Sequence, residues 1–328
     1  MIDATVCIGA VMKGEQPYIV EWVAWHRWLG FDVIIADNGG DDGQTELLLT
    51  LEALGEITRI DVRHITRAPQ RPAYYAIFRH ARRAGVRHLG FLDADEFFEP
   101  LPPPVRPGAG AATVRALFDA ARTEIVAFNW MCFGSSSLRE ASSEPVMRRF
   151  TRSAPPDFDA NRHFKSFGDV ARLHARFGSG TFGRLRLHGH GFDVGAAHQA
   201  LDGAPMTFAP ELGFGVSDRV SWRHARIRHY VVKSIGEYWS RKVARGHVGF
   251  GTYPDWFLEA HDRNDCDTPF DADALVALEA AIRALEARLA ATPAGDPRPR
   301  LARTIATTWQ ARPTAGLLLK RLGRALGR

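Results

Sequence analysis

The N-terminal part of the chain alternates between short apolar segments and longer helical segments, and this alternation is the strongest constraint that the sequence places on the fold. Residues 4–11, 32–36 and 57–62 are rich in β-branched and small apolar side chains, as buried strands are. Residues 17–29 and 45–54 have the composition of helices, so one helix separates each pair of successive strands. This order is typical of βαβ units and predicts an α/β fold in which helices flank a mixed, mostly parallel sheet.

A further apolar run, Leu89–Leu92, ends in three acids within four residues, namely Asp93, Asp95 and Glu96. The run has the length and composition of a buried strand. At the carboxyl end of a parallel strand, the acids would stand in the crevice where open α/β sheets bind ligands. Carboxylates so close repel one another, and Mn²⁺ or Mg²⁺ relieves the repulsion while also binding phosphate oxygens. The run therefore suggests a metal and diphosphate site; the alternative is a solvated junction between strand and loop.

The spacing Asp-x-Asp alone is weak, because it occurs four times in the chain. The other three instances begin at Asp157, Asp265 and Asp271, and none of them follows an apolar run. Position rather than spacing therefore singles out Asp93 and Asp95.

Three further positions carry candidate functional groups. Asp37 ends the second predicted strand, where nucleotide-binding α/β folds contact a ribose or base, although an acid there also stabilises turns. Lys165 is singled out from an arginine-rich stretch, because positive charge opposite an acidic metal site suits a leaving phosphate. His229, in a strand predicted at residues 227–234, is either a late metal ligand or a core histidine.

The basic composition narrows the class of ligand only in part. The formal net charge is +5 and most of the bases are arginine, which favours bidentate contacts to phosphate. RNA-binding signatures, zinc knuckles and helix-turn-helix patterns are absent from the sequence, so we expect no nucleic-acid partner. No apolar stretch approaches the roughly 18 residues of a spanning helix, and the N-terminus shows no leader pattern, so we expect a cytoplasmic protein.

The C-terminal part of the chain has a different composition. Residues 271–292 are predicted to form a helix, and residues 293–328 a linker followed by a basic amphipathic tail. Such a tail lies on an anionic membrane surface, packs on its own domain or mediates association. The first alternative would make the protein peripheral at the inner face of the membrane.

Several short motifs occur along the chain in an informative order. They are Lys13-Gly14-Glu15 with Glu21-Trp22 and His26, Asp37-Asn38, Asp93-Ala94-Asp95-Glu96-Phe97, Phe133-Gly134-Ser135, Lys165, His229-Tyr230 with Lys233-Ser234, Lys242 and Arg245-Gly246. In this order they resemble GT-A type glycosyltransferases of the group that includes family 2 and family 92, also described as DUF23-like. The resemblance covers about residues 4–270, although Gly14 stands where the family usually has Asn and residues 168–226 fit the pattern poorly.

The resemblance implies a GT-A, Rossmann-like domain over residues 1–270. It also implies a metal-dependent, inverting transfer of a sugar from a UDP- or GDP-sugar to a glycan, a lipid-linked acceptor or another hydroxyl group, with Mn²⁺ or Mg²⁺ bound. The implied roles are nucleoside contacts by Glu15 and Asp37, a ribose or sugar contact by Asp93, donor binding by Lys165, and metal binding by Asp95 and His229. The metal and basic groups would stabilise the leaving diphosphate while a carboxylate takes the acceptor proton. The candidates for that general base are Asp193, Glu211 and Asp218.

Two other function classes fit part of the sequence. A metal-dependent nucleotidyl- or phosphotransferase would use the same carboxylates on a different electrophile, but P-loop spacing and the kinase motifs are missing. A non-catalytic protein would bind glycan or anionic lipid through its basic surface. Only a transferase is expected to hydrolyse its sugar nucleotide slowly in the absence of acceptor.

Overall fold

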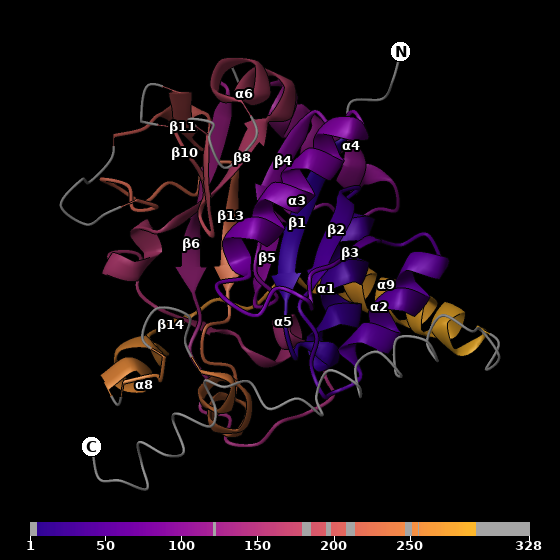
Figure 1. Cartoon of the computed structure of the whole chain (residues 1–328). Helices are drawn as coiled ribbons and strands as arrows, with labels where there is room; N and C mark the ends of the chain where they lie inside the picture. The colour runs from indigo at the N-terminus through magenta and orange to yellow at the C-terminus, as the bar shows by residue number, and fades with distance from the viewer. Residues whose placement is uncertain are drawn as a thin grey trace, which may run out of the picture.

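The chain folds around one central sheet covered by helices, as a computed structural model shows (Figure 1). The structure describes residues 5–120, 123–178, 185–194, 198–207, 214–246, 251–254 and 256–292. Within this part of the chain, the largest sheet contains ten strands.

The N-terminal part of the sheet is parallel. Its strands are β1 (Val6–Met12), β2 (Asp32–Asp37), β3 (Thr58–Asp61) and β4 (His88–Phe91). The helices that connect them are α1 (Gln16–Trp28), α2 (Gln44–Ala53) and α3 (Gln70–Arg83). Strand β1 pairs with both β2 and β4, and β2 pairs with β3. The predicted alternation of strands and helices is confirmed, with boundaries that agree to about two residues.

The remaining strands make the sheet mixed. They are β5 (Glu96–Pro100), β6 (Ile125–Cys132), β8 (Phe164–Asp169), β11 (Gln199–Leu201), β12 (Ala204–Pro205) and β13 (Ala225–His229). Strand β8 runs antiparallel between β4 and β6, and β13 is parallel to β6 and antiparallel to β5. The main path through the sheet is β12-β11-β6-β8-β4-β1-β2-β3.

Shorter elements border the sheet. Two small antiparallel pairs join β7 (Arg152–Ser153) to β14 (Cys266–Asp267) and β9 (Arg186–His188) to β10 (Gly191–Asp193). The other helices are α4 (Ala109–Asp119), α5 (Val146–Arg149), a 3₁₀ turn (Asp159–Arg162), α6 (Val170–Phe177), α7 (Ile235–Glu237), a π-helical segment (Tyr238–Val243), α8 (Trp256–His261) and α9 (Ala272–Ala290).

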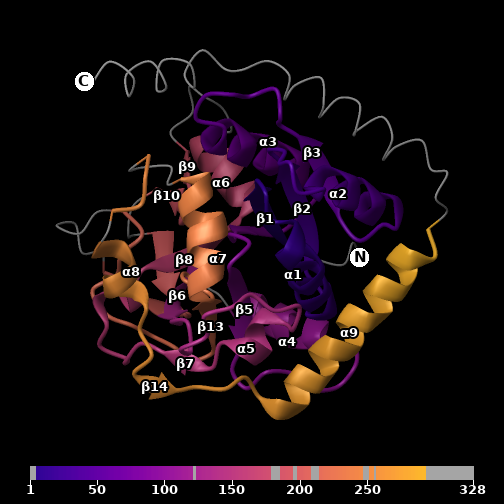
Figure 2. The same ribbon diagram turned by 90° about the horizontal axis from the view of Figure 1, so that it is seen from below.

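Alternate residues of a central strand pack into different hydrophobic cores, because side chains in a strand point to opposite faces. In β2, Val33 and Ile35 pack into the core that includes α1, α2, α4 and α9, whereas Ile34 and Ala36 pack into the core that includes α3 and α6. Figure 2 shows α1 and α9 together on one side of the strands and α3 on the other. The structure therefore confirms a mixed α/β fold with a mostly parallel sheet flanked by helices.

The predicted C-terminal helix corresponds to α9, which packs against α1. The side chain of Asp271 caps its N-terminus by accepting a hydrogen bond from the backbone N–H of Ala274 at 2.9 Å. The predicted domain boundaries at residues 270 and 292 stay predictions, and the predicted tail, residues 293–328, lies outside the described residues. Among the residues that the structure describes, no helix combines the length and apolarity needed to cross a bilayer.

The apolar pattern misses β5 and β8 because both strands carry buried polar residues. Glu96 and Glu99 lie in β5, and Lys165 lies in β8. Lys165 pairs with Glu96 at 2.8 Å, and Arg226 and Arg228 pair with Glu99. A charge enters the interior when a partner compensates its lost hydration, so these strands are buried without being apolar.

Candidate functional site

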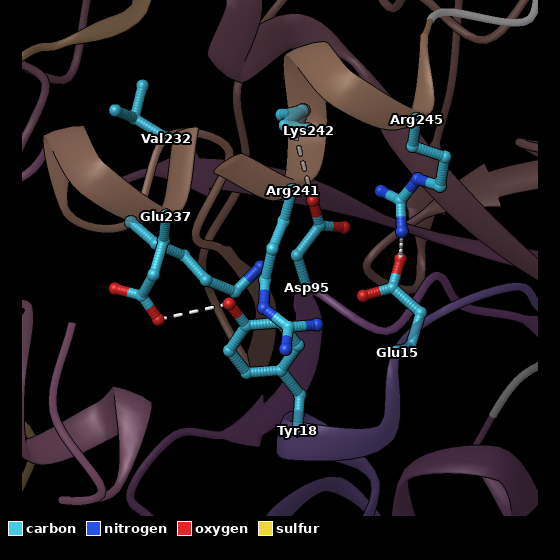
Figure 3. Close-up of a pocket in the computed structure, with 9 residues that line it drawn as sticks. Glu15, Tyr18, Asp95, Val232, Glu237, Arg241, Lys242 and Arg245 are labelled. Carbon is cyan, nitrogen blue, oxygen red and sulfur yellow. Dashed lines mark hydrogen bonds and ion pairs between the residues drawn. The ribbon is translucent and has the colours of Figure 1, made fainter. Parts of the chain in front are cut away.

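A pocket opens where β1, β4 and β13 end. The two strands that neighbour β1 in the sheet, β2 and β4, lie on opposite sides of it. Such a switch point, at the carboxyl ends of the strands, is where open α/β sheets bind ligands. The pocket is lined by Glu15, Tyr18, Asp95, Val232, Lys233, Glu237, Arg241, Lys242 and Arg245 (Figure 3). Its location agrees with the ligand crevice that the sequence predicts at the end of the Leu89–Leu92 run.

The acids after β4 form a tight turn that other groups hold in place. The backbone N–H of Asp93 donates to Glu96 Oε2 at 2.8 Å, and the backbone N–H of Glu96 donates to the carbonyl of Asp93 at 3.0 Å. The indole N–H of Trp22, from α1, donates to the carbonyls of Asp93 and Glu96 at 3.1 and 2.9 Å. The turn is therefore a built structure rather than a solvated junction between strand and loop.

Lys165, in β8, compensates the negative charge of this turn. Its Nζ lies 2.7 Å from Asp93 Oδ2, 2.8 Å from Glu96 Oε2 and 2.8 Å from the carbonyl of Gly189. Burial lowers the pKa of Lys165, but the two carboxylates outweigh it and raise the pKa above the ordinary value. Two hydrogen bonds and the ion pair with Glu96 surround the ammonium, and the side chain is 1 % exposed, so Lys165 positions Asp93 instead of facing a ligand. Asp93 itself is 46 % exposed.

Asp95 faces the pocket with a different set of partners. Its Oδ2 lies 3.1 Å from Lys242 Nζ, and its Oδ1 lies 3.8 Å from His229 Nε2. Burial raises the pKa of the Asp95 carboxyl, but Lys242 and Lys233 outweigh that effect and hold the pKa well below its usual range. Burial also lowers the pKa of His229 well below its ordinary value, so the imidazole is neutral. An ionised carboxylate and a neutral imidazole thus face each other.

These two groups fit a divalent cation only as a partial ligand set. Both are metal ligands in their present protonation states, and no hydrogen bond closes the 3.8 Å between Asp95 Oδ1 and His229 Nε2. The Nδ1 atom of His229 is buried and has no hydrogen-bond partner in the described part of the chain. Across the described ranges, no cluster of three or more His, Cys, Asp or Glu is arranged to hold a metal. Mn²⁺ or Mg²⁺ would therefore need further oxygens, and phosphate groups of a substrate commonly supply them.

Four cations surround the pocket. Figure 3 shows Lys242 donating to Asp95 and Arg245 pairing with Glu15. Lys242 also donates to the carbonyl of Val231. Arg241 approaches Asp42 Oδ2 at 3.7 Å and its guanidinium lies 5.8 Å from the ring of Tyr18. The ammonium of Lys233 lies 4.3 Å from the same ring, and no hydrogen bond or ion pair to it is found among the described residues. Lys233 is 7 % exposed, and burial lowers the pKa of its ammonium while the nearby carboxylates of Asp95 and Glu15 favour the charged form.

The backbone that carries these cations is irregular. The strand predicted at 227–234 ends at His229, and Lys233 adopts a left-handed conformation with φ 60°. Lys242 belongs to the π-helical segment 238–243. Left-handed non-glycine residues and π-helical turns both cost conformational energy and concentrate at functional sites. The side of the pocket formed after β13 therefore carries the signs of a site selected for position rather than for stability.

Glu237 anchors this irregular segment to the rest of the fold. Its carboxylate accepts hydrogen bonds from Arg149 Nη1 at 2.8 Å and from Tyr18 Oη at 3.0 Å. It also completes a capping box with Ser234. Burial raises the pKa of Glu237, but Arg149 and Ser234 outweigh it and lower the pKa to about 2. Glu237 is therefore ionised at neutral pH and ties α7 to α1 and α5.

The structure separates two donor-site candidates that the sequence treats alike. Glu15 lines the pocket, where burial raises its pKa and Arg245 counteracts the increase. Asp37 is fully buried: it accepts hydrogen bonds from Gly39 N at 2.9 Å and Gln44 Nε2 at 3.0 Å, and it pairs with Arg59 at 2.9 Å. With no carboxylate surface left for a ligand, Asp37 matches the turn-stabilising alternative, and its assignment as a nucleoside contact is not supported by this geometry.

The two candidate bases that the structure describes, Asp193 and Asp218, are not among the residues that line the pocket. Asp193 ends β10, and the charges of Asp193 and Asp93 both raise the pKa of His188. Asp218 is 40 % exposed and pairs with Arg219 at 3.2 Å. Glu211 lies outside the described residues. The structure therefore brings Glu15, Asp95 and His229 together, with Asp93 and Lys165 beside them, and the role of general base stays a prediction.

Sequence reasoning gave no role to the basic residues after β13. Lys233, Lys242 and Arg245 are part of the motif series, but arginines are so frequent in this chain that their number hides which cations converge. The clearest signal available was the spacing of Lys242 and Arg245, three residues apart and so on one side of a helical segment.

Comparison with known proteins gives a partial likeness. No family model matches the chain. A glycosyltransferase family 92 protein of Arabidopsis thaliana is 30 % identical over 97 residues, and one of Ricinus communis is 31 % identical over 99 residues. Each match covers 28 % of this chain, which spans only 16 % of the length of either relative. The S. aureus protein TarS is 12 % identical with a TM-score of 0.30, over 52 % of this chain and 29 % of TarS. A structure of TarS 1–349 in complex with UDP gives the same values over 48 % of that chain.

Proposed function

We propose that this protein is a glycosyltransferase that moves a sugar from a nucleotide-sugar donor to a hydroxyl group of an acceptor. The observation that carries the proposal is the pocket at the switch point of the sheet, where Asp95 and Glu15 stand among four cations. A nucleoside diphosphate leaving group is an anion that such cations stabilise. The stretch of likeness to family 92 glycosyltransferases supports the same class.

The donor is a UDP- or GDP-sugar in this proposal, with the diphosphate at the cations and the nucleoside towards Glu15. Asp95 and His229 would hold Mn²⁺ or Mg²⁺ together with phosphate oxygens, and the bound ion would supply charge stabilisation for the departing diphosphate. Asp93, whose carboxylate is exposed and fixed by Lys165, would accept hydrogen bonds from hydroxyl groups of the ribose or the sugar.

The transfer is an inversion in this proposal, with a glycan or a lipid-linked molecule as acceptor. A carboxylate on the acceptor side would remove the hydroxyl proton as the sugar carbon is attacked. Of the two candidates that the structure describes, Asp193 ends β10, which packs against β8, the strand that carries Lys165. We therefore rank Asp193 above Asp218.

The test is hydrolysis of sugar nucleotides in the absence of acceptor. UDP-, GDP-, CMP- and dTDP-sugars are incubated with the protein, with Mn²⁺ or with a chelator, and nucleotide release is measured. We expect release from one nucleotide class, with a loss of at least about 100-fold in Asp95→Asn. Asp265→Asn is a matched control. Asp265 belongs to another Asp-x-Asp, pairs with Arg263 and is not among the residues that line the pocket. The proposal fails if no sugar nucleotide is bound or hydrolysed, or if both variants retain full activity.

A further inference from the structure

Lys242 is bound to the carboxylate of Asp95, the same group that would bind a metal cation. Its Nζ lies 3.1 Å from Asp95 Oδ2, and the side chain is only 13 % exposed, so the ion pair is shielded from solvent. The ammonium is fixed further by a hydrogen bond to the carbonyl of Val231 and lies 5.9 Å from the ring of Tyr253. The carboxylate expected to hold a divalent cation is thus already neutralised by a residue of the chain.

We propose that Lys242 makes metal binding at Asp95 conditional on the nucleotide diphosphate. This inference rests on the proposed glycosyl transfer. Without nucleotide, a divalent ion between Asp95 Oδ1 and His229 Nε2 would stand next to the ammonium on the other oxygen of the same carboxylate. The divalent ion and the ammonium of Lys242, both at one carboxylate, repel strongly in a nearly buried site, so the metal binds weakly. A diphosphate gives both cations a shared anionic partner and removes the conflict.

The surroundings of Lys242 favour this exchange over a purely structural ion pair. Asp95 and His229 offer a metal two ligands, so phosphate oxygens are needed to complete its coordination. Lys233 leaves a nearly buried ammonium without an ionic partner in the described ranges, which provides a place for an anion beside Lys242. If the Asp95–Lys242 ion pair served only stability, a second buried cation without an ionic partner, Lys233, would add nothing at the same pocket.

The experiment measures Mn²⁺ affinity of the full chain by electron paramagnetic resonance, without and with saturating UDP or GDP, in wild type and Lys242→Met. We expect wild type to bind Mn²⁺ at least about tenfold more tightly with nucleotide. In Lys242→Met, Mn²⁺ alone should bind at least about tenfold more tightly than in wild type, and the gain from nucleotide should shrink. Linkage requires that Mn²⁺ tighten nucleotide binding by the same factor by which nucleotide tightens Mn²⁺ binding.

Two further variants separate charge from shape. Lys242→Arg keeps the positive charge and should leave Mn²⁺ binding dependent on nucleotide. Arg263→Met removes a cation that pairs with Asp265 and is not among the residues that line the pocket, so Mn²⁺ affinity should stay within about twofold of wild type. Thermal unfolding of every variant checks that it is folded, and Lys242→Arg supplies the comparison if Lys242→Met is not.

The outcomes distinguish this inference from the proposed function. Equal Mn²⁺ affinity of wild type and Lys242→Met in the absence of nucleotide overturns the role of Lys242, even if the protein hydrolyses a sugar nucleotide. Donor hydrolysis that persists in chelator, with no Mn²⁺ bound in any variant, also overturns it and leaves a metal-independent transferase. Absence of both nucleotide binding and hydrolysis overturns the proposed function itself.

Discussion

Replacing Lys165 with methionine tests whether the acidic turn depends on one buried ammonium. The substitution leaves the apolar stem roughly intact but removes the charge that lies 2.7 Å from Asp93 and 2.8 Å from Glu96. Asp93 is 46 % exposed, so water compensates much of its loss, whereas Glu96 is fully buried. Removing one partner of a buried ion pair costs about 3–5 kcal/mol, and we assign most of that cost to Glu96.

The predicted cost depends on pH with a definite sign. Burial raises the pKa of the Glu96 carboxyl, and Lys165 opposes this increase, so the pKa in Lys165→Met rises further. The folded variant then binds more protons than the unfolded chain above the ordinary pKa of 4.5. Stability of the variant therefore falls as the pH rises, by up to about 1.4 kcal/mol per pH unit. In wild type the pKa of Glu96 is already raised, to about 8, so wild type loses stability in the same way up to that pH. The pKa of Lys165 is raised, so its ammonium stays charged, and the variant falls further below wild type only above about pH 8.

The assay is thermal unfolding of wild type and variants between pH 5.5 and 9.5. A loss of 3–5 kcal/mol corresponds to a fall of roughly 6–20 °C in the midpoint at pH 9.5, with a smaller fall at or below pH 8. Lys165→Met combined with Glu96→Gln should recover part of the loss, because the uncompensated acid is gone. Lys13→Met is the matched control, since Lys13 is exposed and should leave the midpoint unchanged. A midpoint of Lys165→Met that equals wild type, or that rises with pH, would refute the reasoning.

Two more predictions concern the anchor of the pocket and the C-terminal segment. The pKa of Glu237 is lowered from 4.5 to about 2, so its stabilising effect is complete above pH 4.5 and is lost as the pH falls towards 2. Glu237→Gln should therefore lower the unfolding midpoint at pH 7, and the difference from wild type should shrink between pH 4.5 and 2; a constant difference would contradict the assignment. One of the three alternatives for residues 293–328, a basic amphipathic tail that lies on an anionic membrane, predicts binding to phosphatidylserine vesicles. Flotation of the full chain should be lost on deleting the tail or adding about 0.5 M salt, and flotation that survives the deletion would contradict this expectation.

The sequence predicts the parallel part of the fold well because its inner strands, β1, β2 and β4, are largely apolar. Strands such as β1 and β2 lie in the middle of the sheet with both faces covered, and they leave continuous apolar runs between helices. Strands β5 and β8 carry Glu96, Glu99 and Lys165 into the interior, and their partners lie on other elements. No local pattern reveals such pairing, so these two strands become visible only in three dimensions.

The candidate site divides along the same line. Asp95 could be placed from the sequence because it follows an apolar strand whose end faces the crevice, whereas Glu15 was implied only by the resemblance. Asp37 follows a strand in the same way, yet Arg59 and Gln44 take up its carboxylate. The sequence predicts that Lys165 lies opposite the acids after β4. Its contacts with Asp93, Glu96 and the carbonyl of Gly189 show that it stabilises the turn formed by those acids. The sequence could not distinguish these cases because it does not show which partners reach a side chain first.

The antiparallel course of β8 has a consequence for when the site can exist during synthesis. The ammonium that stabilises Asp93 comes from a residue 72 positions later in the chain, and the one that neutralises Asp95 comes 147 positions later. A nascent chain that has completed β4 therefore carries mutually repelling acids and cannot yet form the turn. Closing such distant contacts is slow, so the sheet's first strands should be in place well before the chain becomes competent to bind its substrate.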